Sequence, residues 1–198
     1  MLKMIRAAAL VLALLLTGSA LGADIYYGSW PDEDIYLTQT VKHTCTLVAC
    51  TMMLRNCACR ADDDRYAELT DASVRHYGWT TQYGLSHSFT VLGMEVACSD
   101  EIRRVSDKKQ YLIDCLKAHP EGVVIYDTGA PHAIWLFGYD AGGDLFWCAD
   151  TIPSRGGHEM PLIATSIRGA TQQDKVNTID KIWYVARREY ITTQPSAS

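Results

Sequence analysis

The apolar positions follow a helical pattern in the first half of the chain. The segment from Thr46 to Leu54 contains no proline, glycine or charged residue, and its apolar side chains point to all sides of a helical wheel. Such a pattern predicts a helix that is buried all round. We expect this central helix to run from Cys45 to about Asn56, after a loop over residues 39–44.

Two further helices are predicted from their start and stop signals. The first runs from Asp62 to Tyr77, with acidic residues in its first turn and Gly78 as its stop. The second covers Asp107 to Ala118, with Ser106 as its N-terminal cap and Pro120 beyond its end. Before the central helix, the polar and aromatic stretch over residues 24–38 is expected to be an extended arm.

After Pro120 the pattern changes to short, β-branched or aromatic runs bounded by turn residues, which is typical of strands. The predicted strands are Gly122–Thr128, Ala133–Tyr139, Leu145–Ala149 and Lys181–Arg187, with an earlier short strand over Gly93–Cys98. Helices first and strands afterwards, joined by hairpin-length turns, predict an α+β fold with an antiparallel C-terminal sheet.

Length and composition indicate one domain behind an export signal. The chain has 198 residues, of which 48% are hydrophobic and 21% charged. Residues 1–23 carry Lys3 and Arg6, then a short apolar run and small residues, which is typical of a secretory signal peptide cleaved near Ala20–Ala23. An N-terminal membrane anchor is the alternative, but the apolar run is short for one. We expect a single domain over 24–191, a disordered tail over 192–198, and a secreted or cell-envelope protein.

The charge balance excludes one class of partner. The formal net charge is −5. Without Lys3 and Arg6, 16 basic residues face 23 acidic ones, which gives −7. A nucleic-acid-binding protein would normally carry a basic face, so we expect no nucleic-acid partner. No later apolar run is long enough to span a bilayer, so no integral membrane segment is expected in the mature chain.

The seven cysteines allow several arrangements. An exported protein can form disulfides, and an odd number leaves at least one thiol unpaired within the chain. One reactive Cys45 and up to three disulfides fit the count. The other six cysteines are Cys50, Cys57, Cys59, Cys98, Cys115 and Cys148, and they allow 15 pairings. Alternatively several are buried apolar residues, a role that suits Cys50 and Cys115. Cys57 and Cys59 lack a second closely spaced Cys or His pair, so we expect no metal and no cofactor.

Cys45 and His132 are the candidates for nucleophilic chemistry. At a helix N-terminus, unpaired N–H groups and the helix dipole stabilise a thiolate. A neighbouring imidazole can take the thiol proton if a third polar group holds the ring in place. His132 follows a turn-forming Gly-Ala-Pro and opens a predicted strand, so its ring can face a cleft while Ile134 and Leu136 enter the core.

The strand register predicts the third group. If Asp140 pairs with Asp144 around Ala-Gly-Gly, the hairpin has a three-residue loop in which glycine suits the left-handed position. Ile134 then lies opposite Asp150, and His132 and Asp150 become diagonal neighbours on one face, within side-chain reach. A slip by one residue would place them on opposite faces.

The stretch QTVKHTCTLVACTMML, in which Gln39 precedes Cys45 by six residues, resembles the nucleophile segment of papain-like cysteine peptidases. The stretch PHAIWLFGYDAGGDLFWCAD resembles the His and Asp half of their C39-like, bacteriocin-processing-peptidase-like branch. The resemblance implies a papain-like fold in which Cys45 is the nucleophile, His132 the acid and base, and Asp150 its orienting residue. It also implies that Gln39 donates to the oxyanion hole.

The function implied is an exported cysteine peptidase, a thiol hydrolase that cleaves peptide or isopeptide bonds in a peptide or protein substrate. The Gly-Pro that follows the nucleophile in many C39-like domains is Thr46-Leu47 here. The alternatives are a catalytically silent papain-like binding module and a Cys-dependent amidase or transglutaminase.

Plainer interpretations of the single residues remain open. Cys45 alone could be half of a disulfide, His132 a core histidine at a strand end, and Asp150 a turn former. The rival bases are His43 and His158, and the rival acids are Asp127 and Asp140.

Overall fold

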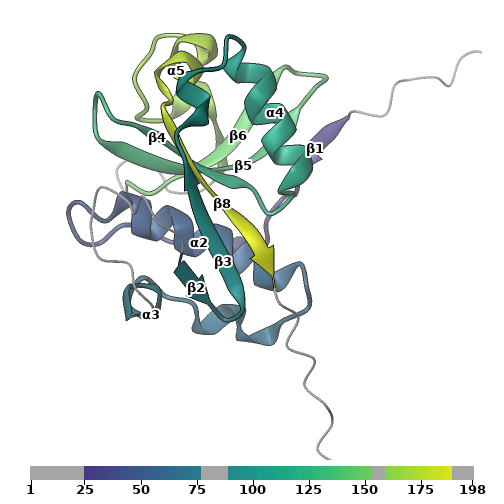
Figure 1. Ribbon diagram of the computed structural model, residues 1–198, viewed down its shortest axis with the longest axis vertical. Helices are drawn as coiled ribbons and strands as arrows, with labels where there is room; N and C mark the ends of the chain where they lie inside the picture. Colours follow the sequence, from purple (N-terminus) through teal and green to yellow (C-terminus); the bar gives the residue numbers. More distant parts are fainter. Residues whose placement is uncertain (1–24, 77–88, 153–158, 189–198) are drawn as a thin grey trace, which may run out of the picture.

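The computed structural model describes residues 25–76, 89–152 and 159–188. The chain is a mixed α+β protein with a helical N-terminal part and, within these residues, an eight-stranded antiparallel sheet (Figure 1). The α+β class predicted from the sequence is therefore confirmed at this level. The predicted signal segment 1–23, its cleavage near Ala20–Ala23, and the tail 192–198 lie outside the described residues.

The N-terminal part contains the central helix. It begins with β1 (Tyr26–Gly28) and the 3-10 helix η1 (Glu33–Ile35), which together form the predicted arm. Helix α2 (Cys45–Cys59) follows and starts at the predicted residue, and it extends three residues beyond Asn56. All of its residues are buried except Arg55 and Cys59, as the all-round apolar pattern indicates.

The predicted helix over Asp62–Tyr77 is wrong. The segment forms the 3-10 helix η2 (Asp64–Glu68) and a separate short helix α3 (Asp71–His76). Two backbone features prevent one continuous helix: Asp62 has a φ of 54°, and Leu69 is extended between the two pieces. Tyr77 and Gly78, the predicted end and stop, lie outside the described residues.

Helix α4 (Lys108–Ala118) is where the sequence predicts it, with a different cap. The side chain of Asp107, and not that of Ser106, accepts a hydrogen bond from the backbone N–H of Gln110 at 2.9 Å. A short carboxylate at this position satisfies one of the unpaired N–H groups of the first turn and suits the positive end of the helix dipole.

The sheet has the strand order β2-β3-β8-β4-β5-β6-β7, and β1 pairs with β5 beside this path. The predicted strands are β3 (Met94–Ser99), β4 (Val123–Asp127), β5 (His132–Asp140), β6 (Leu145–Asp150) and β8 (Lys181–Arg188). The sequence did not predict β1, β2 (Phe89–Val91), β7 (Glu159–Pro161), the 3-10 helices η1, η3 (Glu101–Arg103) and η5 (Leu162–Ala164), or helix α5 (Gln172–Thr178). These elements are too short to show a clear period.

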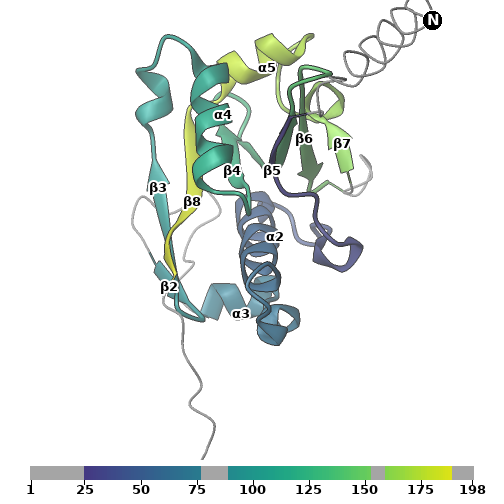
Figure 2. The same cartoon turned by 90° about the vertical axis from the view of Figure 1, so that its right-hand side faces the viewer.

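The sheet is covered on both faces. Alternate residues of β5 divide between two apolar clusters: Trp135 and Phe137 pack with α2, whereas Ile134 and Leu136 pack with α4. Figure 2 shows α2 and α4 as separate helices against the sheet, with α5 near α4. Double coverage explains why β5 is an unbroken buried run with no polar alternation.

The hairpin between β5 and β6 reaches the predicted pairing by a different route. Asp140 pairs with Leu145 and not with Asp144, and Asp144 itself takes the positive φ of 55° that was expected of a glycine. An irregularity between Leu136 and Gly138 shifts the register by one residue, as a β-bulge does. The pairing of Ile134 with Asp150 is therefore the predicted one, because the bulge compensates for the longer loop.

All seven cysteines are free thiols in the structure, and none forms a disulfide. Cys50 and Cys148 are fully buried, so they act as small core residues. Cys115, for which a buried role was also predicted, is only partly buried against the second cluster. Within the described ranges, no helix is both long and apolar enough to cross a membrane.

Candidate functional site

Cys45 lies at the N-terminal end of the buried helix. It is the first residue of α2, follows the cap residue Thr44, and is 7% exposed. The hydroxyl of Thr44 donates to the carbonyl of Val41 at 2.8 Å, which holds the preceding loop against the helix start. Packing of α2 against the sheet thus fixes the sulfur beside the beginning of β5.

His132 is brought to the sulfur by the strand turn. It is the first residue of β5 and pairs with Asp127, the last residue of β4. Its ring lies close enough to Cys45 for each group to shift the pKa of the other. The ring atom Nε2 lies 2.9 Å from Oδ1 of Asp150, which leaves Nδ1 as the nitrogen for the sulfur. The backbone N–H of Ala133 also helps to lower the pKa of the Cys45 thiol.

Asp150 ends β6 and is fully buried. Its Oδ1 contacts His132 and accepts from the backbone N–H of Ile152 at 3.2 Å. Its Oδ2 accepts from the backbone N–H of Ser166 at 2.9 Å and from the Ser166 hydroxyl at 2.5 Å. A buried carboxylate with this many donors is held in its charged form and in one orientation.

The surroundings shift the pKa values of Cys45, His132 and Asp150, and each of the three shifts favours the charged form. Burial opposes ionisation of Cys45, but the hydrogen bond and charge of His132 outweigh it and lower the pKa of the thiol. Burial also opposes the imidazolium, yet Asp150 and Cys45 together raise the pKa of His132 to about 9. Burial disfavours the Asp150 carboxylate too, and His132 and Ser166 lower its pKa to about 2 against this. The three shifts act in the same direction, since each favours a thiolate and an imidazolium beside a carboxylate.

Gln39 lies next to this cluster. Its backbone N–H donates to the carbonyl of Thr151 at 2.8 Å, and the Thr151 hydroxyl donates to Oε1 of Gln39 at 3.3 Å. Its side-chain Nε2 donates to the carbonyl of Val41 at 2.8 Å. One of the two amide hydrogens is therefore engaged within the loop, and the second remains for a ligand.

A pocket of about 380 Å³ opens onto the sulfur. It is lined by Gln39, Thr40, Val41, Lys42, His43, Cys45, Pro131, His132 and Ile152. The pocket joins the loop before α2 to the start of β5 and the end of β6, so all of the predicted site residues except the buried Asp150 line it. Its size suits a short stretch of a peptide.

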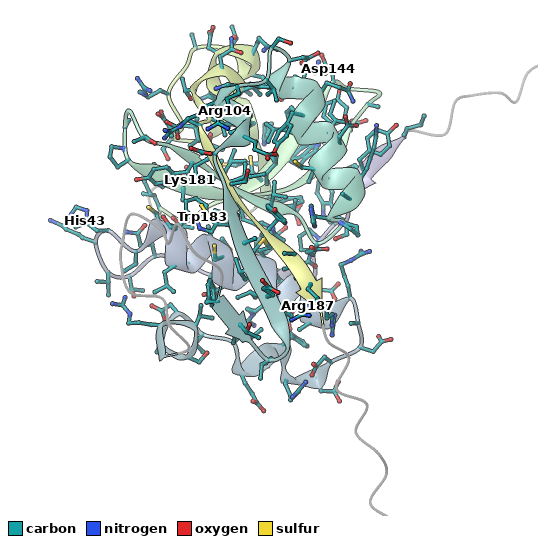
Figure 3. The ribbon with its side chains drawn as sticks, in the orientation of Figure 1. His43, Arg104, Asp144, Lys181, Trp183 and Arg187 are labelled. Carbon is teal, nitrogen blue, oxygen red and sulfur yellow. The ribbon has the colours of Figure 1, made fainter. Side chains whose placement is uncertain are left out.

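The rival residues are placed elsewhere or otherwise engaged. His43 lies on the pocket rim, has a φ of 65°, and its side chain points outward from the molecule (Figure 3). Asp127 is bound by the guanidinium of Arg168 at 2.6 and 2.7 Å. Asp140 stands at the opposite end of β5 from His132. His158 lies outside the described residues.

Sequence reasoning missed Ser166 and Arg168. Neither residue belongs to a periodic run or motif, and Ser166 follows Asp150 by 16 positions. The only sequence signal was a buried acid that needs donors, and it does not say where the donors come from. In the described part of the chain, no group of three His, Cys, Asp or Glu side chains could hold a metal ion.

Comparisons with protein-family models, with curated proteins and with solved structures found no match. The fold and the site therefore define the class of protein by themselves: a mixed α+β domain that brings a cysteine, a histidine and an aspartate together at a surface pocket. Such an arrangement can generate a nucleophilic sulfur and move a proton to a leaving group.

Proposed function

We propose that this chain is a cysteine peptidase, a thiol hydrolase of the papain-like, C39-like kind, that cleaves peptide or isopeptide bonds. The observation that carries the proposal is the continuous contact from the Cys45 sulfur through the His132 ring to the Asp150 carboxylate. Three residues from three elements, α2, β5 and β6, meet beside one pocket. A structural role for any one of them would not require the other two.

The chemistry follows from the charge state of the pair. The Cys45 thiolate attacks the carbonyl carbon of the substrate, and the C–N bond breaks as the His132 imidazolium gives its proton to the leaving amine. The enzyme is left as a thioester. Water then attacks this thioester while neutral His132 takes its proton, and the second product leaves as a carboxylic acid. Asp150 keeps the ring oriented through both steps.

The oxyanion of each tetrahedral intermediate needs donors near the sulfur. We assign this role to the side-chain amide of Gln39 and the backbone N–H of Cys45 at the helix start. Gln39 lines the same pocket as Cys45 and retains one amide hydrogen beside its bond to Val41. The positive end of the α2 dipole acts in the same direction.

The place of action is proposed from the N-terminal pattern alone. Lys3 and Arg6, the apolar run and the small residues up to Ala23 support export, after which the domain acts outside the cytoplasm or in the cell envelope.

Selective alkylation tests the proposal. Iodoacetamide at about pH 6 should modify Cys45 far faster than Cys59, because only Cys45 has a lowered thiol pKa whereas that of Cys59 is raised by burial and by Asp32. The readout is mass spectrometry of the modified peptides over time. The C45S variant is the control for the site, and a quenched-fluorescence peptide library then tests hydrolysis.

The outcomes separate the alternatives. Fast alkylation of Cys45 with hydrolysis of library members that C45S does not hydrolyse supports the peptidase. Fast alkylation without hydrolysis, but with transfer of an acyl group to an added amine, indicates a transglutaminase or amidase. Alkylation of Cys45 no faster than that of Cys59 overturns the enzyme and leaves a binding module.

A further inference from the structure

A segment outside the predicted triad contacts both Asp150, which binds the His132 ring, and Asp127, which pairs with His132 between β4 and β5. We call residues 165–168, which run from Thr165 to Arg168, the 165–168 brace. Ser166 within it gives two hydrogen bonds to Asp150, and Arg168 gives two to Asp127. The brace follows the 3-10 helix η5 and leads into the loop before α5.

The Asp150 contact is direct. The Ser166 hydroxyl and backbone N–H both bind Oδ2, the carboxylate oxygen that does not face His132. With Oδ2 fixed at 2.5 and 2.9 Å, the carboxylate plane cannot rotate, so Oδ1 stays aimed at the ring. Ser166 therefore acts on the imidazole through Asp150, as a positioning residue.

The Asp127 contact anchors the strand turn from which His132 projects. Asp127 is fully buried, is paired with His132 in the register, and accepts from the backbone N–H groups of Gly129 and Ala130. The guanidinium of Arg168 binds both carboxylate oxygens of Asp127, at 2.6 and 2.7 Å. A Cβ on Gly129 would lie 2.1 Å from Nη2 of Arg168, so the turn closes directly on the brace.

The brace itself is held by a buried lysine. Lys175 of α5 is 4% exposed, and its ammonium donates to the carbonyls of Thr165, at 3.0 Å, and Ile167. These two carbonyls flank Ser166 on either side. A Cβ on Gly169, which has a φ of +134°, would lie 2.6 Å from the backbone nitrogen of Lys175, so the chain passes very close to the helix here. Burying an ammonium is costly, and its hydrogen bonds to carbonyls offset that cost.

We propose that the 165–168 brace, clamped by Lys175, is a positioning device that aligns the His132 and Asp150 pair, with Ser166 as its contact residue. The inference rests on the proposed function, since it assigns new residues to the same site. It extends the site from three residues to a network that includes α5, an element with no residue in the pocket lining.

The physical effect is on the charge state of Cys45. The charged and titratable groups that face Asp150 are His132 from β5, Cys148 from its own strand, and, beyond Cys148, Lys175 from α5. Loss of the Ser166 hydroxyl removes one of the two donors to Oδ2 and leaves the Ser166 backbone N–H, so the carboxylate is held less firmly. A misaligned carboxylate stabilises the His132 imidazolium less, which lowers the pKa of His132. With less imidazolium present, the Cys45 thiolate is stabilised less and the pKa of the thiol rises.

The test measures the pH dependence of Cys45 alkylation by iodoacetamide, followed by mass spectrometry, in S166A, K175M and the unsubstituted protein. For S166A we expect the acid limb of the alkylation profile to move upward by at most about one pH unit. One pKa unit is about the free energy of one hydrogen bond to a charged group, and this bond is to Asp150, so it affects the thiol only through His132. NMR of the His132 ring should show a matching fall in its pKa. K175M should also raise the acid limb of Cys45 alkylation and lower the pKa of His132.

The matched control is S106A, which removes a hydroxyl from an exposed loop residue next to α4. It should leave the acid limb unchanged, and thermal unfolding checks that S166A and K175M are folded at the assay temperature. If K175M is unfolded, S166A alone decides the matter. An acid limb of S166A that coincides with that of S106A overturns the brace. Absence of any fast Cys45 alkylation in the unsubstituted protein overturns the proposed function instead.

Discussion

His132 and Asp150 lie diagonally across β5 and β6, and their side chains meet at 2.9 Å although the register pairs Asp150 with Ile134. This diagonal contact is what allows the ring to reach both the carboxylate and the Cys45 sulfur.

The pH dependence of hydrolysis should be bell-shaped. Acylation needs the Cys45 thiolate, which forms above its lowered pKa, and the His132 imidazolium, which is lost as the pH rises through about 9. The value of kcat/KM for a fluorogenic peptide should therefore fall at both ends, with the alkaline limb near pH 9. A rate that keeps rising above that limb would contradict the ion pair.

The H132Q variant should lose the activated thiol. Without the imidazolium, the pKa of Cys45 returns to or above its ordinary range because burial then dominates. At about pH 6 the thiolate fraction, and with it the rate of iodoacetamide alkylation, should fall by about tenfold for each unit by which the thiol pKa rises. H43Q is the matched control, since His43 lies on the rim of the same pocket. Equal loss in both variants would argue for His43.

Asp150 should contribute to acid stability. Its folded-state pKa of about 2 lies below the value near 3.9 of an unfolded chain. The contribution is therefore complete above about pH 4 and is lost as the pH falls toward 2. The coupled pair should account for on the order of 2 kcal/mol of unfolding free energy. Urea unfolding at several pH values measures it.

The matched control for this measurement is Asp100→Asn at an exposed site. D150N should be less stable than the unsubstituted protein at neutral pH and should lose less stability on acidification. D100N should follow the unsubstituted protein throughout. A D150N curve parallel to that of D100N would remove Asp150 from the account of acid stability.

The Q39A variant should separate nucleophile activation from transition-state stabilisation. Loss of one oxyanion donor typically lowers kcat by about 10² to 10³. Alkylation of Cys45 needs no oxyanion hole and should stay within about twofold of the unsubstituted rate. Q173A, on the exposed side of α5, is the control. Parallel loss of alkylation and hydrolysis in Q39A would mean that Gln39 only shapes the loop.

The second apolar cluster should be separable from the site. Leu116 of α4 is fully buried in that cluster, so L116A should lower the free energy of unfolding by about 2 to 5 kcal/mol. The neighbouring K117A removes a half-exposed side chain paired with Asp114 and should cost at most about 1 kcal/mol. Urea unfolding measures both. Cys45 alkylation in the folded proteins should be unchanged, and a loss in L116A would show that α4 also supports the site.

Local pattern was enough wherever a residue's role depends on its own neighbours in the chain. The all-round apolar run after Cys45 predicted the start and burial of α2, and the short aromatic and β-branched runs predicted five of the described strands. It failed at Asp62–Tyr77, where the positive φ of Asp62 and the extended Leu69 break the helix. The acidic residues expected in a first helical turn are present, but the helix cannot run through Leu69, whose backbone is extended.

The hairpin register shows how a correct pairing can rest on compensating differences. The two-residue side-chain period of strands, combined with the expected hairpin pairing, predicted that His132 and Asp150 share one face. The loop is longer than predicted, and the irregularity between Leu136 and Gly138 restores the pairing of Ile134 with Asp150. The expected register took no account of Gly138, which lies directly beside the irregularity, although an isolated glycine within a strand often marks a bulge.

The sequence by itself determined the apolar helix that begins at Cys45, five of the strands, and the order of cysteine, histidine and aspartate, since each is encoded by local period and spacing. Only the tertiary structure decided which groups surround the buried Asp150 carboxylate. Ser166 reaches the carboxylate from a loop, and Lys175 holds that loop from a short helix. Neither segment shows a period in the sequence, and contacts between distant segments depend on packing in three dimensions. The physical reason is that a buried charge requires donors, while the chain leaves open which segment supplies them.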